Sequence, residues 1–176
     1  MNRLLINKKE KELYLKFKAL SECTSEGKGK AIHYLHCENG DLVATDGCRM
    51  MILHGTGLDD GNYRALITKD AILIEQIEET DIHYPRYQQV IQKNQDIIAS
   101  GNIYDYTDIV SLALILNKCI NPRQFKVLFP LKENWKLYHN GLNAPVTLVT
   151  IGITFIVMPL KEPTSFKPDN NLKQEN

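Results

Sequence analysis

Apolar side chains recur along the chain in short runs, which polar turn residues separate. Residues 3–7 form an apolar run of strand length. In residues 10–22, Leu13, Phe17 and Leu20 recur at helical spacing and would share one face of a helix. The pattern therefore predicts a strand followed by an amphipathic helix at the start of the chain.

The next part of the chain is typical of antiparallel strands. Residues 31–47 indicate a hairpin, because Asn39-Gly40 is a pair that a two-residue hairpin turn favours. Residues 49–55 and 62–68 are two further strand candidates. Several consecutive strands without long crossovers predict an antiparallel sheet.

Residues 69–79 fit two patterns. Asp70 is suited to cap a helix in which Leu73 and Ile77 face inward, yet the first residues of the segment also alternate as in a strand. We predict a helix here. Residues 83–96 follow as a connector that carries tyrosine and proline side chains.

The rest of the chain repeats the order of a helix and strands. Residues 105–122 are apolar on nearly all sides, which predicts a largely buried helix with Asp105 or Thr107 as its N-cap. Strands are expected after this helix at residues 123–129, 134–140 and 145–160.

This order of elements predicts an α+β domain of two strand-helix-strands halves with antiparallel sheets. An approximate twofold axis would relate the halves, and both helices would lie on one side of the sheets. We place this single domain at residues 1–160. Residues 161–176 lack a hydrophobic pattern and are expected to form a flexible tail.

Composition fits one compact domain, since 43% of the 176 residues are hydrophobic. The 21 basic residues balance the 21 acidic ones, which excludes a strong overall attraction to nucleic acid. Residues 1–30 nevertheless hold eight basic and four acidic residues. Lys11, Lys16 and Lys18 lie away from the apolar stripe of the first helix. They are candidates for contact with DNA phosphates, and the alternative is a solvated helix face.

Cysteine spacing and the length of the apolar runs bear on location. Cys23, Cys37, Cys48 and Cys119 show no paired spacing, which is typical of reduced thiols. The apolar part of the N-terminus is too short for a signal peptide, and the longest apolar run, residues 109–116, is too short to span a bilayer. We expect a cytoplasmic protein without a membrane segment.

One group of side chains suggests a zinc site. His33, His36, Cys37 and Cys48 are all potential zinc ligands. In a strand, however, His36 would point away from the face that His33 and Cys37 share. The paired-ligand spacing of structural zinc sites is also absent. Ordinary strand residues are the better interpretation.

Enzymatic chemistry has little support in the sequence. It contains no glycine-rich phosphate loop and no G-x-S-x-G or H-E-x-x-H motif. Asp59-Asp60 lacks the further oxygen ligands of a calcium loop and indicates a turn. Cys48 is a possible nucleophile, but a lone thiol in a strand-rich core is more often a packing residue. We expect no enzymatic activity, no cofactor and no metal.

Three segments resemble the bacterial DNA polymerase III beta subunit, the sliding clamp. The segment "LVATDGCRMMIL" (42–53) is similar to a strand-loop-strand that in this family runs approximately Ala-Thr-Asp-Gly-His-Arg-Leu. "YPRYQQVIQKN" (84–94) looks like the family's domain-linking segment, and "FIVMPL" (155–160) looks like its terminal Val-Met-Pro motif. The segments occur in family order, so the resemblance implies one DNA-clamp-like domain over most of residues 3–160.

In that family these segments wall an apolar pocket that captures short linear peptides of polymerases, loaders and repair proteins. The resemblance implies that Met50 and Met158 form adaptable apolar walls, and that Gly47 lets a peptide backbone approach. Arg49 would orient a peptide carbonyl or carboxylate. Alternatively the segments pack into the core, in which case Met158 would be fully buried. The candidate pocket residues are Thr45, Gly47, Cys48, Arg49, Met50, Pro85, Tyr87, Val90, Val157, Met158 and Pro159.

The chain also departs from the family. Family clamps carry three such domains per chain and two chains close a ring, whereas this chain is long enough for one. Cys48 replaces the loop histidine, and Gln88-Gln89 replaces a basic pair. The resemblance favours a non-enzymatic interaction protein linked to DNA replication or repair, with short linear peptides as partners. The alternative is a self-assembling ring around duplex DNA, which would require a homo-oligomer and weak, non-specific DNA binding.

Overall fold

The structure is a computed structural model that describes residues 3–25, 31–78, 82–91, 97–105, 107, 108, 111, 121–139 and 144–159. The predicted tail at 161–176 and most of the predicted helix at 105–122 lie outside these residues. No helix in the described ranges is long and apolar enough to cross a membrane.

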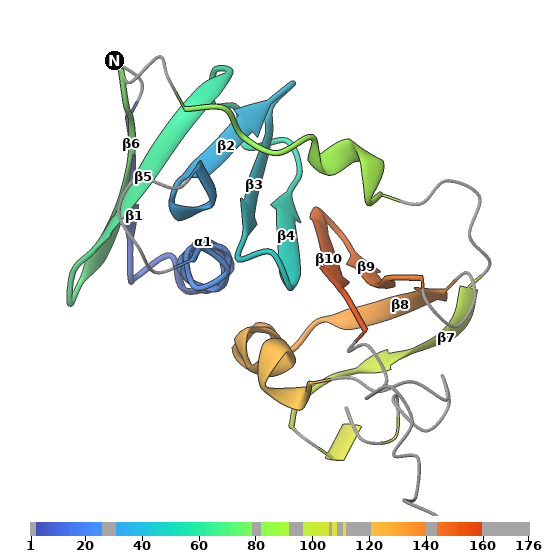
Figure 1. Cartoon of the computed structure of the whole chain (residues 1–176). Helices are drawn as coiled ribbons and strands as arrows, with labels where there is room; N and C mark the ends of the chain where they lie inside the picture. The colour runs from blue at the N-terminus through green and yellow to red at the C-terminus, as the bar shows by residue number, and fades with distance from the viewer. Residues whose placement is uncertain are drawn as a thin grey trace, which may run out of the picture.

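Two halves of the chain build one sheet (Figure 1). The first half contains β1 (Arg3–Asn7), α1 (Lys11–Ser21), the 3₁₀ helix η1 (Ala31–His33), β2 (Leu35–Glu38), β3 (Asp41–Thr45), β4 (Arg49–Leu53), β5 (Gly61–Ile67) and β6 (Ala71–Gln76). A connector follows, with the 3₁₀ helix η2 (Tyr87–Gln89). The second half contains β7 (Ile97–Asn102), the 3₁₀ helix η3 (Pro122–Leu131), β8 (Asn134–His139), β9 (Val146–Thr150) and β10 (Ile153–Val157).

The described strands form a ten-stranded sheet in the order β1-β6-β5-β2-β3-β4-β10-β9-β8-β7. Every strand pair is antiparallel, which confirms the predicted α+β class with antiparallel sheets. The halves meet where β4 pairs with β10, with Arg49 opposite Val157 and Met50 opposite Ile156. We refer to this strand pair as the seam.

Each face of the sheet buries its own set of apolar side chains. The main core lies between one face and the helices α1 and η3, where Phe17, Leu20 and Phe125 pack with Phe155 of β10. In Figure 1, α1 is seen along its axis beside η3. Because strand side chains alternate, the other face carries a second cluster. It contains Val43, Met50, Ile52, Tyr87 and Ile156.

Several local predictions are confirmed. Asn39 and Gly40 have φ angles of 54° and 79°, as the predicted tight hairpin turn between β2 and β3 requires. Asp105 is the N-cap of the second predicted helix, since its carboxylate accepts hydrogen bonds from the backbone N–H groups of Thr107 and Asp108 at 2.7 and 3.3 Å. A hydrogen bond with the Thr107 side chain, together with these backbone bonds to the charged form, lowers the pKa of Asp105. The proposed twofold relation of the halves depends on this helix and stays a prediction.

The helix predicted at residues 69–79 is wrong, because this segment forms strand β6. β6 lies between β1 and β5, so both of its edges carry strand ladders. Ile72 and Ile74 face the core and are fully buried, whereas Leu73 faces outward. Pairing on both sides outweighs the helix-capping signal of Asp70.

The strand predicted at residues 123–129 is also wrong, because these residues belong to η3. The Asn121 side chain accepts a hydrogen bond from the backbone N–H of Arg123, and proline opens the helix. Phe125 and Leu128, three residues apart, are both fully buried, which fits the three-residue turn of a 3₁₀ helix.

Three smaller differences complete the comparison. Residues 145–160 form the hairpin of β9 and β10 instead of one strand, and the chain turns at Gly152 with a φ angle of 75°. The sequence pattern did not predict β7, whose side chains are mostly exposed. On α1, Leu13 is 41% exposed and Tyr14 is buried in its place.

Candidate functional site

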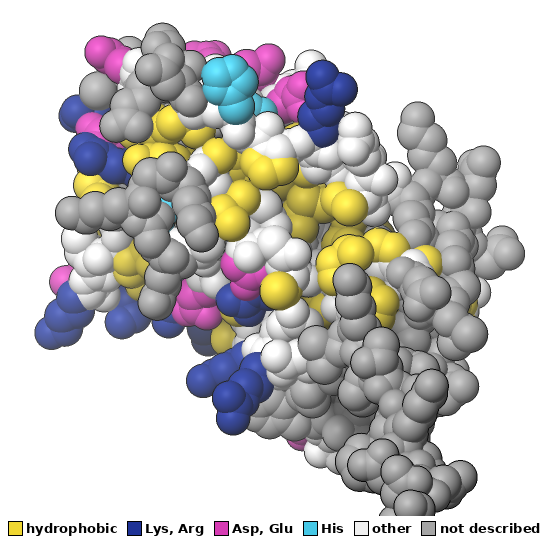
Figure 2. Space-filling model, in the orientation of Figure 1, with side chains coloured by type: hydrophobic (Ala, Val, Ile, Leu, Met, Phe, Trp, Pro, Cys, Tyr) yellow, Lys and Arg dark blue, Asp and Glu magenta, His cyan; other side chains and the backbone are white. Residues whose placement is uncertain are grey.

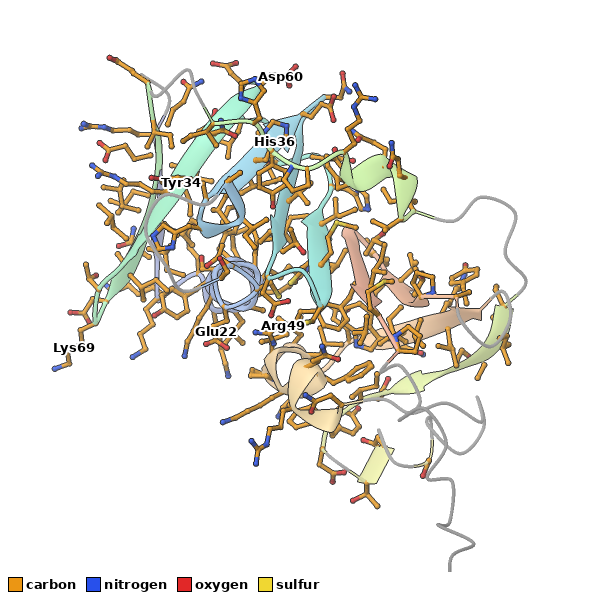
Figure 3. The ribbon with its side chains drawn as sticks, in the orientation of Figure 1. Glu22, Tyr34, His36, Arg49, Asp60 and Lys69 are labelled. Carbon is orange, nitrogen blue, oxygen red and sulfur yellow. The ribbon has the colours of Figure 1, made fainter. Side chains whose placement is uncertain are left out.

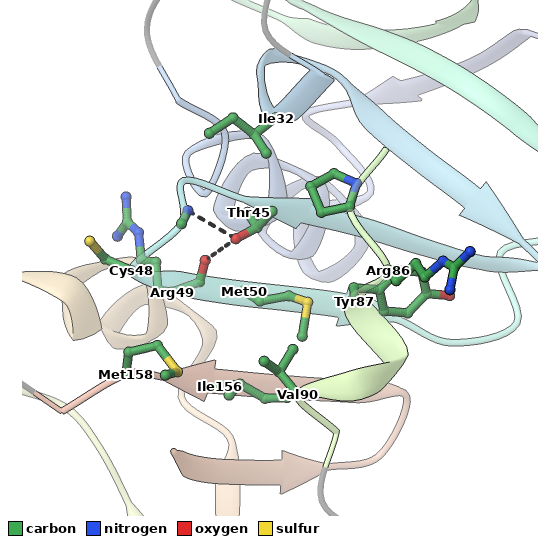
Figure 4. A pocket seen from close by; sticks show the side chains of 12 residues that line it. Ile32, Thr45, Cys48, Arg49, Met50, Arg86, Tyr87, Val90, Ile156 and Met158 are labelled. Carbon is green, nitrogen blue, oxygen red and sulfur yellow. Dashed lines mark hydrogen bonds between the residues drawn. The ribbon is translucent and has the colours of Figure 1, made fainter. Parts of the chain in front are cut away.

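A pocket of about 200 Å³ opens on the sheet face opposite α1 and η3, where the connector crosses the seam. Figure 2 shows hydrophobic side chains gathered on the surface in this region. Figure 4 shows the pocket from close by. The lining residues are Ile32, Thr45, Gly47, Cys48, Arg49, Met50, Pro85, Arg86, Tyr87, Val90, Ile156 and Met158.

The floor of the pocket is apolar and belongs to the seam. Met50 and Ile156 are direct cross-strand neighbours and are 4% and 2% exposed. Met158 follows on the same side and is 39% exposed. Tyr87 and Val90 pack against this floor from the connector. The pocket therefore draws its apolar surface from both halves of the chain.

Polar side chains of the loop between β3 and β4 shape the rim. The Thr45 hydroxyl donates to the Arg49 carbonyl at 2.7 Å and accepts from the Gly47 N–H at 3.1 Å. Asp46 Oδ1 accepts from the N–H groups of Cys48 and Arg49, both at 2.9 Å. Gly47 has a φ angle of 88°, which favours glycine. The Thr-Asp-Gly sequence thus closes a tight turn at the pocket rim.

Arg49 joins this loop to the helices on the other side of the sheet. Its Nε donates to Asp46 Oδ2 at 3.0 Å, and its Nη1 donates to the Gln124 carbonyl of η3 at 3.0 Å. Its Nη2 donates to the Glu22 carbonyl, at the end of α1, at 2.6 Å. Figure 3 shows Arg49 and Glu22 lying close together. Three N–H donors of this guanidinium are therefore engaged within the protein, which gives Arg49 a structural role beside its place in the pocket lining.

Stacked rings hold the connector in place. The rings of Tyr84 and His36 are stacked with their centroids 4.8 Å apart, and the Tyr87 ring meets His36 edge-on. His36 Nδ1 lies 2.8 Å from Asn62 Oδ1. Burial raises the pKa of Tyr84 and raises the pKa of Tyr87 to about 12. Both phenols are neutral at ordinary pH, and Tyr87 adds an uncharged ring to the pocket lining.

Comparison with protein-family models and with curated proteins finds no match. Solved structures do match. The DNA polymerase III beta subunit of Thermotoga maritima superposes with a TM-score of 0.57 at 11% identity, over 90% of this chain and 65% of that one. The sliding clamp of Bacillus subtilis gives a TM-score of 0.57 at 11% identity, over 91% of this chain and 64% of that one.

This chain has the sliding-clamp fold. The Helicobacter pylori beta clamp, solved bound to a DNA ligase peptide, also matches, with a TM-score of 0.52 at 12% identity over 90% of this chain and 65% of that one. The chain thus spans about 65% of the length of the clamp chains that it matches. The sequence resemblance to the clamp family, stated from three short segments, leads to the same fold.

Within this clamp fold, nine of the eleven candidate residues line the pocket. Val157 does not, because it faces the main core and is fully buried. Pro159 follows Met158 without lining the pocket. Ile32, Arg86 and Ile156 line it without having been candidates. Alternation along β10 could have identified Ile156, since residues 156 and 158 share a face, whereas no sequence signal pointed to Ile32.

The three lysines of α1 do not form one open basic surface. Lys16 Nζ lies 2.7 Å from Glu12 Oε1 and 3.4 Å from Glu133 Oε1. The Lys16 side chain is 19% exposed. Lys18 pairs at 3.9 Å with Glu22, and Lys11 is exposed. Lys11 and Lys18 are therefore the better candidates for contact with phosphate.

The potential zinc ligands lie apart. His33 Nδ1 is 3.0 Å from the Ser25 carbonyl, and the Cys37 thiol donates to the Leu58 carbonyl. Cys48 is exposed at the pocket rim. Among the described residues, no three His, Cys, Asp or Glu side chains are grouped as a metal site would require.

Proposed function

We propose that this protein is a non-enzymatic, clamp-like interaction protein of DNA replication or repair, and that the pocket at the seam binds short linear peptides. One observation carries the proposal. Three segments that lie far apart in the sequence, residues 45–50, 85–90 and 156–158, meet in one apolar pocket. The partners would be replication or repair proteins that present such a peptide.

The pocket suits a peptide with two apolar anchors. Its floor consists of Met50 and Ile156, and Met158 with Val90 forms a wall. Methionine side chains adapt to different apolar groups at low cost. A short peptide buries little area, so the expected dissociation constant is on the order of micromolar or weaker.

The comparison with the Helicobacter pylori clamp supports this use of the fold. That structure holds a DNA ligase peptide on a protein whose fold this chain shares. The support is one of fold and not of sequence, since the identity is 12%.

Met158→Glu tests the proposal. Met158 is 39% exposed, so a glutamate can be hydrated there without unfolding the protein, while it places a charge on the apolar wall. Ile151→Glu is the matched control, because Ile151 is 89% exposed at the β9–β10 turn and does not line the pocket. The probes are the DNA ligase peptide and short fluorescein-labelled peptides with two leucine or phenylalanine anchors at varied separations.

The expected result is that at least one probe binds the wild type and Ile151→Glu alike, and binds Met158→Glu at least about tenfold more weakly, a loss of about 1.4 kcal/mol. Thermal unfolding of both variants should match the wild type. Binding that survives Met158→Glu would place the peptide elsewhere, and a wild type that binds none of the probes would count against a peptide-binding function.

A further inference from the structure

The chain leaves β10 as part of the pocket wall. The backbone N–H of Met158 donates to the Cys48 carbonyl at 2.9 Å, which fixes the chain at the rim. Pro159 is the last described residue, and residues 160–176 follow it in the sequence. This segment therefore starts next to the pocket.

Residues 161–176 have the composition of a tethered ligand. Most of their side chains are polar or charged, and the large apolar exceptions are Phe166 and Leu172. A segment with so few apolar side chains cannot bury a core of its own. Its two anchors nevertheless match what the apolar floor and wall of the pocket can accept.

Charge does not oppose docking of this segment in the pocket. Arg49 uses three of its N–H donors within the protein, so Arg86 presents the exposed guanidinium among the lining residues. Figure 4 shows Arg86 beside Tyr87, at the edge of the pocket. Asp169 lies midway between Phe166 and Leu172 in the sequence. The segment as a whole has no net charge, since Lys161, Lys167 and Lys173 balance Glu162, Asp169 and Glu175.

We propose that residues 161–176 dock in this pocket of their own chain, with Phe166 and Leu172 as anchors, and so compete with peptides from other proteins. The inference rests on the proposed peptide-binding function and adds its regulation. The segment is long enough to place Phe166 in the pocket, because the eight residues from Met158 to Phe166 can span up to about 26 Å. The pocket lies across two neighbouring strands and the connector that crosses them.

The expected effect follows from tethering. A short flexible tether holds a ligand at an effective concentration on the order of 1 mM. A tail with an intrinsic dissociation constant of about 0.1 mM would then fill about nine tenths of the pockets. It would weaken the binding of an external peptide about tenfold.

The test compares three proteins that each comprise residues 1–176: the wild type, a Phe166→Ser/Leu172→Ser variant, and an Asn170→Ser/Asn171→Ser control in the same segment. The probes are a fluorescein-labelled peptide of residues 161–176 and the best binder of the two-anchor peptides. Both should bind the Phe166→Ser/Leu172→Ser protein about tenfold more tightly than the other two. A maleimide should also label Cys48 faster in that variant, because Cys48 is exposed in the pocket lining.

Equal affinities in all three proteins would overturn the proposal. So would failure of the 161–176 peptide to bind the Phe166→Ser/Leu172→Ser protein. If the two-anchor peptide binds all three proteins equally and is lost with Met158→Glu, the pocket still binds peptides and only the role of the tail is refuted. If neither peptide binds any of the three, both proposals fail.

Discussion

Replacing Arg49 should separate its structural role from its place in the pocket lining. Arg49→Ala removes the hydrogen bonds to the carbonyls of Glu22 and Gln124, which link the end of α1 to the start of η3. It also removes the favourable position of a cation at the C-terminal end of a helix. The loop would lose the contact between Arg49 and Asp46 as well.

The magnitude follows from these contacts. A hydrogen bond from a charged donor contributes about 1.5 kcal/mol net. Water can replace part of the bond at the exposed Glu22 carbonyl, and the partly exposed pair with Asp46 adds little. We expect Arg49→Ala to lower the free energy of unfolding by about 2 kcal/mol, which is about 6 °C in Tm for a chain of this size. Lysine can reach one of the two carbonyls, so Arg49→Lys should lose about 1 kcal/mol.

Urea unfolding followed by circular dichroism measures both losses. Arg86→Ala is the control, because Arg86 is an exposed arginine that lines the same pocket. That change should cost less than about 0.5 kcal/mol. An Arg49→Ala protein as stable as the Arg86→Ala protein would show that the contacts of Arg49 with α1 and η3 do not stabilise the fold.

Three further predictions concern DNA, thiols and pH. If α1 contacts DNA, binding should be weak, indifferent to sequence and steeply dependent on salt, and Lys11→Glu/Lys18→Glu should abolish it in a fluorescence anisotropy titration. Binding that resists salt would exclude this helix as the contact surface. Lys16→Glu is a poor test because it would place a third carboxylate beside Glu12 and Glu133. Burial raises the pKa of Cys23 to about 12, so a thiol reagent at pH 8 should label Cys48 in the native protein and Cys23 only after unfolding. Mass spectrometry of the labelled peptides measures this order, and labelling of native Cys23 as fast as that of Cys48 would contradict the burial of Cys23. Burial raises the pKa of Tyr63 from 10 to about 12, so its neutral form contributes stability that is complete below pH 10 and is lost as the pH rises toward 12. Between pH 10 and pH 12 the urea midpoint should fall less steeply for Tyr63→Phe than for the wild type, and an identical slope would show that Tyr63 does not cause the loss of stability.

Local pattern and turn chemistry were sufficient to predict most strands of the first half. Asn39 and Gly40 favour the positive φ angles that a tight hairpin turn requires, so the hairpin could be predicted without tertiary information. β6 could not be distinguished from a helix in the same way, because what decides it is pairing with β1 and β5. Residues 123–129 are mixed apolar and polar in a way that fits a strand or a 3₁₀ helix, and the packing of Phe125 against Phe155 decides between them.

The candidate pocket was reached through a family resemblance and not through pattern. Nothing in the spacing of residues 45–50, 85–90 and 156–158 indicates that they meet, since the contact depends on the pairing of β4 with β10. The resemblance placed Met158 in the pocket lining, and its 39% exposure is at odds with the alternative that it is fully buried in the core. It did not resolve which side chains of β10 face outward, so Val157 was chosen in place of Ile156.

The seam has a consequence for the order in which this molecule can assemble. Met50 and Ile156 are neighbours in space but are separated by more than 100 positions in the sequence. Contacts of such long range close a large loop, and proteins rich in them fold slowly. The first half can pair its own strands as soon as they are synthesised, yet the pocket does not exist until β10 docks against β4. The pocket is therefore a marker of the completed fold, and a chain that is unfinished, truncated before β10 or locally open at the seam presents no such surface to a partner.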